Sequence, residues 1–262
     1  MQPSPKSAER GVPSLVWRAG QERRLAIIRD AAGDRLKGGH VLDVGCGVGM
    51  YMRAFRQLTP HVFGVDIESE WARESHTYGE VAQSPGEALP FAEGVFDLVL
   101  SHEVIEHVAD DKASVAEMVR VLKPSGRLVL FCPNRLYPFE THGHYWQGRY
   151  HFGNTPLINY LPNRLRDWLV PHVRAYTVGR LRALLAGLPV RVVVHTQIYP
   201  GYDNVSARYP AIGRLLRWGR KGLEQTPLRA FGLSHFLVAE KHHPDEGVPV
   251  APRETWRDGG VI

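Results

Sequence analysis

The chain has 262 residues, of which 44% are hydrophobic and 23% charged, a composition typical of a folded globular protein. This composition excludes wholesale disorder and the collagen-like and coiled-coil classes. No apolar run approaches the roughly 20 residues of a membrane-spanning helix, and the first ten residues lack the apolar stretch of a secretory signal, so we expect a cytoplasmic protein. Only Cys46 and Cys132 are cysteines, which excludes a disulfide scaffold.

The net charge of +5 is unevenly distributed along the chain. Residues 134–230 contain 14 Lys or Arg against 4 Asp or Glu, whereas both flanking parts are slightly acidic. Such asymmetry indicates an anionic partner for the middle third, which could be a charged small molecule, an acidic membrane surface or nucleic acid. A solvated basic face is the alternative.

Strand and helix patterns alternate over most of the chain. Apolar runs predict strands at residues 40–45, 61–66, 96–101, 127–132, 190–195 and 235–240. Helical spacing predicts helices at residues 15–36, 50–58 and 70–78, one capped by Asp110 or Asp111, and one capped by Thr177. Lys123-Pro-Ser-Gly126 is typical of a turn. This alternation predicts an α/β fold with a mainly parallel sheet covered on both faces, whose ligands lie beyond the carboxyl ends of the strands.

The pattern predicts a single domain over residues 15–241. Residues 1–14 and 242–262 lack apolar periodicity, and we expect a flexible arm and a flexible tail. Two irregular stretches, at about residues 134–176 and 200–232, interrupt the alternation, and we expect them to form a lid over the site.

A glycine-rich segment follows the first predicted strand. It reads Asp43-Val-Gly45-Cys46-Gly47-Val-Gly49, an acid followed by G-x-G-x-G. The dinucleotide fingerprint G-x-G-x-x-G cannot be drawn through these glycines, which disfavours a nicotinamide-dependent oxidoreductase. Glycines at this spacing allow the backbone to approach a ligand closely and to adopt positive φ.

At this point the sequence resembles the class I S-adenosylmethionine-dependent methyltransferases. V-L-D-V-G-C-G-V-G matches the first motif of that family, and residues 86–91, 94–99, 101–107 and 122–126 are similar to its later motifs in the same order. The sequence resembles the small-molecule methyltransferase type and is similar to the group that acts in ubiquinone and menaquinone biosynthesis. The resemblance implies a Rossmann-like, doubly wound sheet of seven strands, S-adenosyl-L-methionine as cofactor and S-adenosyl-L-homocysteine as product.

The resemblance also implies which residues hold the cofactor. Asp43 would receive the ammonium of the methionine part, and Asp66 would accept both ribose hydroxyls, as a carboxylate can. Pro85 stands where many relatives carry an acid for the adenine amino group. Adenine would therefore be held by the backbone around Gly86 and Glu87, or by the Glu87 carboxylate. The remaining cofactor candidates are Gly45, Cys46, Gly47, Gly49, Ile67, Ser101 and Glu103.

Methyl transfer to an oxygen releases a proton, which a histidine can accept near neutral pH. His142 and His144 follow the fifth expected strand of the family, where the acceptor should enter, and one of them is our expected base. His107 lies in the family segment after the fourth strand and is the alternative base, although it could instead fix the turn structurally.

Aromatic residues accompany these histidines. We expect Tyr145, Trp146 and Tyr150 to form a wall over the acceptor, with ordinary lid packing as the alternative. The histidine spacing matches no zinc pattern and no cysteine or paired carboxylate joins it, so we expect no metal.

The sequence defines the methyl acceptor and the partners less closely than it defines the cofactor. An oxygen of a small molecule, a glycan or a lipid-linked acceptor, anionic or neutral, is favoured. Ser101-His-Glu-Val104 stands where base methyltransferases carry N/D-P-P-Y/F, so nucleic acid is not favoured. An RNA or protein methyltransferase and a non-catalytic S-adenosylmethionine-binding protein are the alternatives.

A basic helix is expected at residues 212–223, from Ile212 to Leu223. It could lie on an acidic membrane, but its internal glycines favour a helix that closes the substrate cleft.

Overall fold

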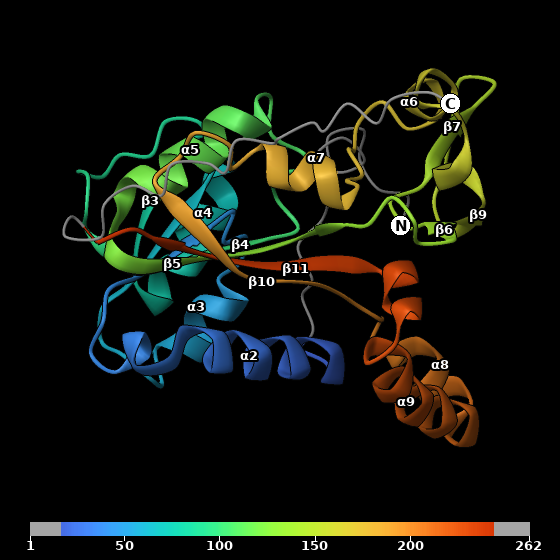
Figure 1. Cartoon of the computed structure of the whole chain (residues 1–262), viewed down its shortest axis with the longest axis horizontal. Coiled ribbons are helices and arrows are strands. Elements are labelled where there is room, and N and C mark those ends of the chain that lie inside the picture. The colour runs from blue at the N-terminus through green and yellow to red at the C-terminus, as the bar shows by residue number, and fades with distance from the viewer. Residues whose placement is uncertain (1–16, 244–262) are drawn as a thin grey trace, which may run out of the picture.

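The computed structural model describes residues 17–243 (Figure 1). The predicted arm at residues 1–14 and nearly all of the predicted tail at 242–262 lie outside the described residues. No helix in the described part is long and apolar enough to cross a membrane.

A seven-stranded sheet runs through the centre, with strand order β10-β11-β5-β4-β1-β2-β3. The strands are β1 (Val41–Val44), β2 (Val62–Asp66), β3 (Glu80–Gln83), β4 (Phe96–His102), β5 (Leu122–Pro133), β10 (Val190–Ile198) and β11 (Ser234–Lys241). Strands β1 to β5 are parallel, and β11 is antiparallel to both β5 and β10. The predicted mostly parallel, seven-stranded α/β architecture is therefore confirmed.

Two details of the strands differ from the prediction. β3 is partly exposed and lies outside the predicted strands, because E-V-A-Q has no continuous apolar run. The predicted turn at residues 123–126 lies inside the bounds of β5, but its residues have no partner on β4, because Leu122 pairs with Phe96 and the pairing resumes at Arg127 with Leu98. The turn chemistry instead produces an irregular register and a positive φ of 61° at Ser125.

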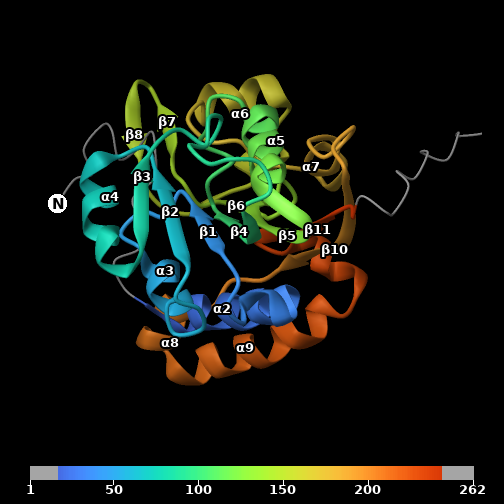
Figure 2. The same ribbon diagram turned by 90° about the vertical axis from the view of Figure 1, so that its left-hand side faces the viewer.

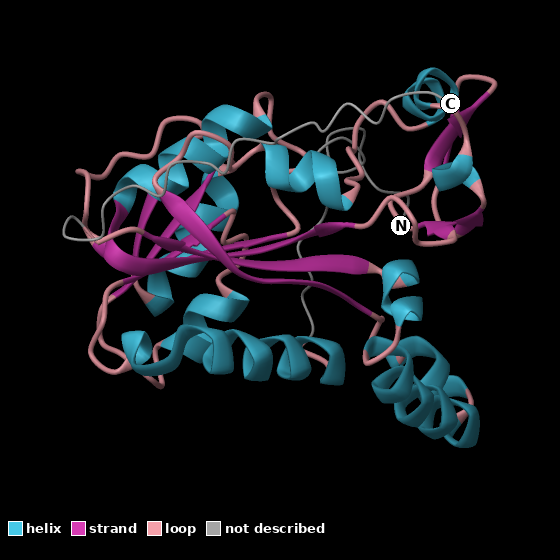
Figure 3. Ribbon diagram, in the orientation of Figure 1, coloured by secondary structure: helices cyan, strands magenta, loops and turns pink. Residues whose placement is uncertain are grey.

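Helices cover both faces of the sheet, as Figures 2 and 3 show. Helices α2 (Ala19–Ala32) and α3 (Met50–Phe55) pack on one face, and α5 (Asp111–Val121) and α7 (Val178–Ala183) pack on the other. Helix α4 (Ser69–Ser75) lies against β2 and β3. The shorter 3-10 helices are η1 (Gly33–Leu36) and η2 (His76–Tyr78). Asp110 caps α5 and Thr177 caps α7 through their side chains, as the sequence predicts.

The first insertion forms a small lobe beyond β5 (Figure 1). It contains β6 (Phe139–Glu140), β7 (His144–Trp146), β8 (Arg149–His151), β9 (Thr155–Pro156), η3 (Ile158–Tyr160) and α6 (Asn163–Leu169). Its own apolar cluster consists of Ile158, Leu169, Val170 and Val173. Tyr176 ties the lobe to the body, because its buried hydroxyl donates to the Ile105 carbonyl at 2.9 Å.

The second insertion is helical and lies beside α2 (Figure 2). It contains α8 (Asp203–Arg208), α9 (Pro210–Glu224) and η4 (Pro227–Phe231), so the predicted basic helix extends slightly beyond residues 212–223.

Candidate functional site

The loop after β1 has the backbone shape that its glycines were expected to allow. Gly45, Gly47 and Gly49 have φ values of 73°, 52° and 78°. A Cβ added at Gly45 would lie 2.4 Å from Cγ2 of Val104, so a side chain here would have to displace the segment after β4. Any residue other than glycine would therefore be strained by conformation and by contact.

Cys46 contributes only backbone to this loop, because its thiol is buried beside Ser75 and burial raises its pKa.

Asp66 ends β2 and already organises this loop. Its Oδ2 accepts from the Gly47 amide at 2.8 Å, and its Oδ1 accepts from the Glu68 amide at 2.9 Å. Burial raises the pKa of the carboxyl. Each carboxylate oxygen can accept a further hydrogen bond, so both can still receive a ribose hydroxyl. Ile67, another of the cofactor candidates, is half exposed next to it.

Asp43 lies within β1 and is 3% exposed. Burial, together with the neighbouring Asp66 charge, raises the pKa of Asp43 to about 8. The group is therefore mostly neutral at pH 7 in the protein alone. An ammonium ion at this position would favour the charged form, as the methionine part of the cofactor requires.

The segment after β3 is held next to Asp66 by a hydrogen bond, in which the Ser84 amide donates to the Asp66 carbonyl at 3.1 Å. The Glu87 carboxylate accepts from the Asp110 amide at 3.0 Å, so it is directed toward the start of α5. Gly86 is close to α5 as well, since a Cβ there would lie 2.7 Å from the Ser114 hydroxyl. These contacts favour the backbone, of the two predicted alternatives, for adenine.

The end of β4 carries buried polar groups. The Ser101 hydroxyl is buried and has no hydrogen-bond partner among the described residues. Glu103 adopts a positive φ of 57°, an unusual conformation for glutamate that fits a functional turn. Burial opposes its charge, but Arg24 at 3.3 Å and several smaller contributions, including the bond from the Ser234 hydroxyl, together lower the pKa of Glu103 to about 2. An unpartnered buried hydroxyl beside the glycine loop fits a polar ligand there.

Arg24 is a site residue that the sequence did not predict. It comes from α2 and does not belong to the buried apolar side of that helix, which is formed by Leu25, Ile28 and Ala32. Its guanidinium instead lies 2.6 Å from Nε2 of His102 and donates to the Ser234 hydroxyl at 3.0 Å. Burial and Arg24 together lower the pKa of His102 to about 3, so that ring is neutral.

An acid and two histidines meet beyond β4. Glu106, His107 and His142 each offer a ligand atom, and these atoms lie within 4.8 Å of one another. Both carboxyl oxygens of Glu106 are buried without a hydrogen-bond partner in the described part of the chain. Burial and the nearby Glu103 charge raise the pKa of Glu106, while burial and His142 lower the pKa of His107 to about 4. Both groups are thus held neutral, and Glu106 had not been predicted as a site residue.

His142 is oriented by the lid. Its Nδ1 lies 3.2 Å from Oε1 of Glu140, and Oε2 of Glu140 accepts from Arg166 at 2.9 Å. Burial opposes the charge of Glu140, but the bond from His142 and the charge of Arg166 lower its pKa to about 2. A charged carboxylate on Nδ1 favours the proton on that nitrogen and leaves Nε2 free to accept another.

His144 lies elsewhere on the lobe. It is near the Thr155 hydroxyl at 3.1 Å and its ring stacks on His151 at 5.2 Å, while burial and His151 lower its pKa. Of the two predicted bases in the lid, the structure therefore brings only His142 to His107.

A cavity of about 950 Å³ extends from Glu106 and His107 into the first insertion. Its lining is strongly basic and aromatic, and includes Tyr145, Trp168, His172, Arg135, Arg166, Arg174 and Arg180. Of the predicted acceptor wall, Tyr145 lines the cavity, and Tyr150 supports it by donating to the His142 carbonyl. Trp146 is half exposed and reaches the cavity only through ring contact with Trp168. The second insertion contributes no residue to this lining, so the predicted closure of the cleft by its basic helix is not seen.

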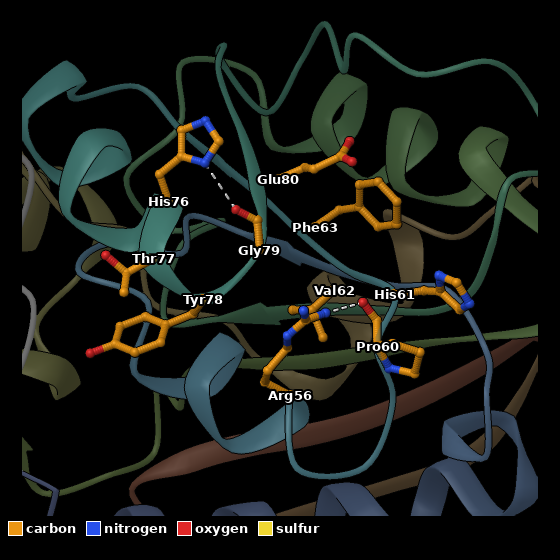
Figure 4. A pocket seen from close by; sticks show the side chains of 10 residues that line it. All are labelled: Arg56, Pro60, His61, Val62, Phe63, His76, Thr77, Tyr78, Gly79 and Glu80. Atoms are coloured by element: carbon orange, nitrogen blue, oxygen red, sulfur yellow. Dashed lines mark hydrogen bonds between the residues drawn. The ribbon is translucent and has the colours of Figure 1, made fainter.

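A smaller cavity of about 390 Å³ lies at the other end of the sheet (Figure 4). Its lining includes His61 and Glu80, at or next to the amino ends of β2 and β3. Because ligands of such folds bind beyond the carboxyl ends of the strands, this cavity is separate from the candidate site.

The strand order and the glycine loop together define a Rossmann-like fold of the class I methyltransferase type. An S-adenosylmethionine-dependent methyltransferase from Mesorhizobium loti has the same fold, with a TM-score of 0.59 and 17% identity over 85% of this chain and 98% of that one. A similar structure from Listeria monocytogenes, a putative enzyme of the same class by its description, has a TM-score of 0.55 and 13% identity over 86% and 98% of the two chains.

Sequence comparison is consistent with this fold type. Residues 42–130 match the model of the methyltransferase domain. A probable S-adenosylmethionine-dependent methyltransferase of Mycolicibacterium smegmatis is 29% identical over 50% of this chain and 52% of its own length. A ubiquinone biosynthesis O-methyltransferase of Rhodopseudomonas palustris is 34% identical over 43% and 51%. The chain spans about half the length of the curated relatives it matches.

Replacing Asp66 by alanine tests the ribose assignment. Asp66→Ala removes the acceptor for two ribose hydroxyls, each bond being worth roughly 1.5 to 3 kcal/mol, so S-adenosylhomocysteine should bind at least about tenfold more weakly. Isothermal titration calorimetry measures this change, and a folded variant with unchanged affinity would contradict the assignment.

The pH dependence of cofactor binding tests Asp43. Because the pKa of Asp43 is raised to about 8, binding of an ammonium must displace a proton at lower pH. The Kd for S-adenosylhomocysteine should therefore fall by up to about tenfold per unit as pH rises from about 6 to 8, and then level off. In Asp43→Asn the binding should be weak and nearly independent of pH over this range; a wild-type Kd that stays flat would overturn the role of Asp43.

Proposed function

We propose that this chain transfers the methyl group of S-adenosylmethionine to an oxygen of a small anionic acceptor bound in the 950 Å³ cavity. The observation that carries the proposal is the pairing of Glu140 with His142, which places an oriented histidine beside Glu106 and His107 next to the cavity. The ubiquinone O-methyltransferases among the relatives support an oxygen acceptor by analogy.

The residues of this chain divide into two sets of tasks. When bound, the cofactor supplies a methyl carbon attached to a positively charged sulfur. Asp43, Asp66 and the glycine loop hold and orient it, and alignment of the acceptor with that carbon is the main contribution of such a site. His142 then takes the acceptor proton on Nε2, and the charged Glu140 stabilises the imidazolium that forms.

Glu106 has a complementary role in this scheme. Its carboxyl is held neutral by burial and by Glu103, so it is a hydrogen-bond donor at neutral pH. A neutral donor can orient an acceptor hydroxyl without adding negative charge next to a proton that must leave. His107 is neutral too, and its ring contact with His142 at 5.6 Å positions that ring.

The size of the cavity favours a small acceptor over a macromolecule. Its volume is in the usual range of small-ligand sites, about 300 to 1,000 Å³. A glycan or lipid-linked acceptor is compatible if only its reactive head enters.

Two arginines of the lining favour an anionic acceptor. Nη1 of Arg135 is buried without a hydrogen-bond partner in the described part of the chain. Burial and the charges of Arg166 and Arg180 oppose the charge of Arg135, which lowers its pKa. Arg180 lies over the Tyr176 ring, and no carboxylate among the described residues pairs with it. A carboxylate or phosphate on the acceptor would relieve this repulsion and supply the missing partner.

Exchange of single histidines tests the proton acceptor. His142→Gln should lower kcat by roughly 10²-fold to 10⁴-fold while cofactor binding is retained, because a positioned base contributes about that much. The matched control is His144→Gln, in the same lobe but outside the cluster, which should keep wild-type kcat. The assay detects S-adenosylhomocysteine released in a screen of hydroxylated acceptors. Equal losses in both variants would contradict the assignment.

The same assay with a chelator tests an alternative use of the cluster. Glu106, His107 and His142 are close enough to hold a divalent cation, so activity is measured with EDTA and then with Mg²⁺ or Zn²⁺ restored. Unchanged activity is expected for a proton acceptor. Loss with EDTA and recovery with the metal would assign the cluster to cation binding instead.

Substitution on α7 tests the anionic acceptor. Arg180→Gln should raise KM for a carboxylate or phosphate acceptor at least about tenfold with little change in kcat, because the lost contact is to a non-reacting part of the acceptor. Arg182→Gln is the matched control, since Arg182 is on the same helix but bonds to His195. An unchanged KM for the charged acceptor in Arg180→Gln, or a neutral ester analogue that the wild type uses as well as the charged acceptor, would contradict the proposal.

A further inference from the structure

Helix α9 packs against the body with its polar side. Arg217 pairs with Asp203 at 3.2 Å and donates to the Gly201 carbonyl at 3.1 Å. Glu224 pairs with Arg23 of α2 and accepts from the Tyr199 amide at 2.8 Å. An ordinary surface helix turns its apolar stripe to the core, so α9 is inverted.

The apolar side of α9 consequently faces solvent. Ile212, Leu215 and Trp218 are 51%, 65% and 77% exposed, and Leu228 and Phe231 of the following η4 are 49% and 42% exposed. Figures 1 and 2 show α9 on the outside of the molecule. Large apolar side chains clustered on a surface mark an interaction site rather than a solvated face.

The glycines of α9 fit this orientation. Gly213 faces the protein, where a Cβ would lie 2.3 Å from the Ser206 hydroxyl of α8, so it permits the close packing of the two helices. Gly219 and Gly222 have no neighbouring atom within 4 Å of an added Cβ. From the sequence, these glycines favoured a helix that closes the substrate cleft. In the structure they do not place α9 in that cleft.

The exposed charged residues around this apolar side are all positively charged. The exposed charged residues of the second insertion are Arg208, Arg214, Lys221 and Arg229. Its two acids, Asp203 and Glu224, are turned inward and paired with arginines. This arrangement complements an anionic surface. A second copy of the chain docked through the same face would bring these like charges together, which disfavours a symmetric dimer.

We propose that the outward face of α9, defined by Ile212, Leu215, Trp218, Arg214 and Lys221, docks on the surface of a membrane rich in anionic phospholipids. The apolar side chains would enter the interface at headgroup depth, Trp218 would sit between them and the cations, and the cations would bind lipid phosphates. This surface is separate from the methyl-transfer site and does not depend on the proposed function.

Vesicle binding by the full chain tests the proposal. The protein is sedimented with vesicles of phosphatidylcholine alone and with vesicles of equal parts phosphatidylcholine and phosphatidylglycerol. At least about tenfold tighter binding to the anionic vesicles is expected, decreasing as salt is raised. The variant Leu215→Ser with Trp218→Ser should lose at least about tenfold in this binding, and its thermal unfolding should match wild type because both side chains are exposed.

Two further variants separate the contributions. Arg214→Gln with Lys221→Gln should reduce the preference for anionic vesicles. Phe152→Ser removes another exposed aromatic residue, 79% exposed in the first insertion, and should bind as wild type does.

Three results would overturn the proposal. They are equal binding to both vesicle types, undiminished binding of the Leu215→Ser with Trp218→Ser variant, and a stable dimer in solution that this variant dissociates. The last would assign the face to a second copy of the chain. Methyl transfer is measured separately in detergent-free buffer with a soluble acceptor, so failure of vesicle binding and failure of the proposed activity are distinguishable.

Discussion

The structure beyond the carboxyl ends of the strands depends on how the charge of each buried Asp or Glu side chain is balanced. Asp43, Glu103, Glu106 and Glu140 all lie largely out of water there, where an unpaired charge is costly. Arg24 contacts Glu103, and His142 and Arg166 contact Glu140, so both carboxylates stay charged. No arginine pairs with the other two in the described structure, and both are held neutral. The edge thus contains two fixed charges and two groups whose charge depends on what binds beside them.

The body and the lid have different roles in the proposed site. On the proposed function, the body would hold the cofactor through Asp43, Asp66 and the backbone of the glycine loop, where a Cβ added at Gly45 or Gly49 would lie under 3 Å from neighbouring atoms. The lid would supply side chains for the acceptor, and their position would depend on the attachment of the lobe to the body. Tyr176 provides that attachment through Ile105, one residue before Glu106. A change in lid packing would therefore displace His142 relative to the cofactor, so that acceptor positioning would suffer before cofactor binding.

The parts of the structure that sequence could predict are those set by local pattern. Six strands of the central sheet, the glycine loop and the caps at Asp110 and Thr177 follow from apolar periodicity and side-chain chemistry over a few residues. Arg24 could not be predicted, because its contact with Glu103 joins residues 79 positions apart and its own helical pattern indicates solvent. His142 and His144 could not be separated, because the choice depends on tertiary contacts: Glu140 of β6 orients the His142 ring, whereas the β7–β8 hairpin stacks the His144 ring on His151. The orientation of α9 was likewise inaccessible, since the pattern of a helix does not say which of its sides meets the protein.

The excess of positive charge in the middle third of the chain resolves into two surfaces with different exposures. Arg135 and Arg180 face the cavity next to the histidines, whereas Arg214 and Lys221 border the outward face of α9. The excess of Lys and Arg in this third of the chain thus contributes to two separate surfaces, and a count of charges along the sequence cannot distinguish them. On the two proposals together, an anionic amphiphile is the acceptor that fits best, because its head group would enter the cavity while its apolar part stays in the membrane that α9 contacts. A freely soluble anion would use only the first surface.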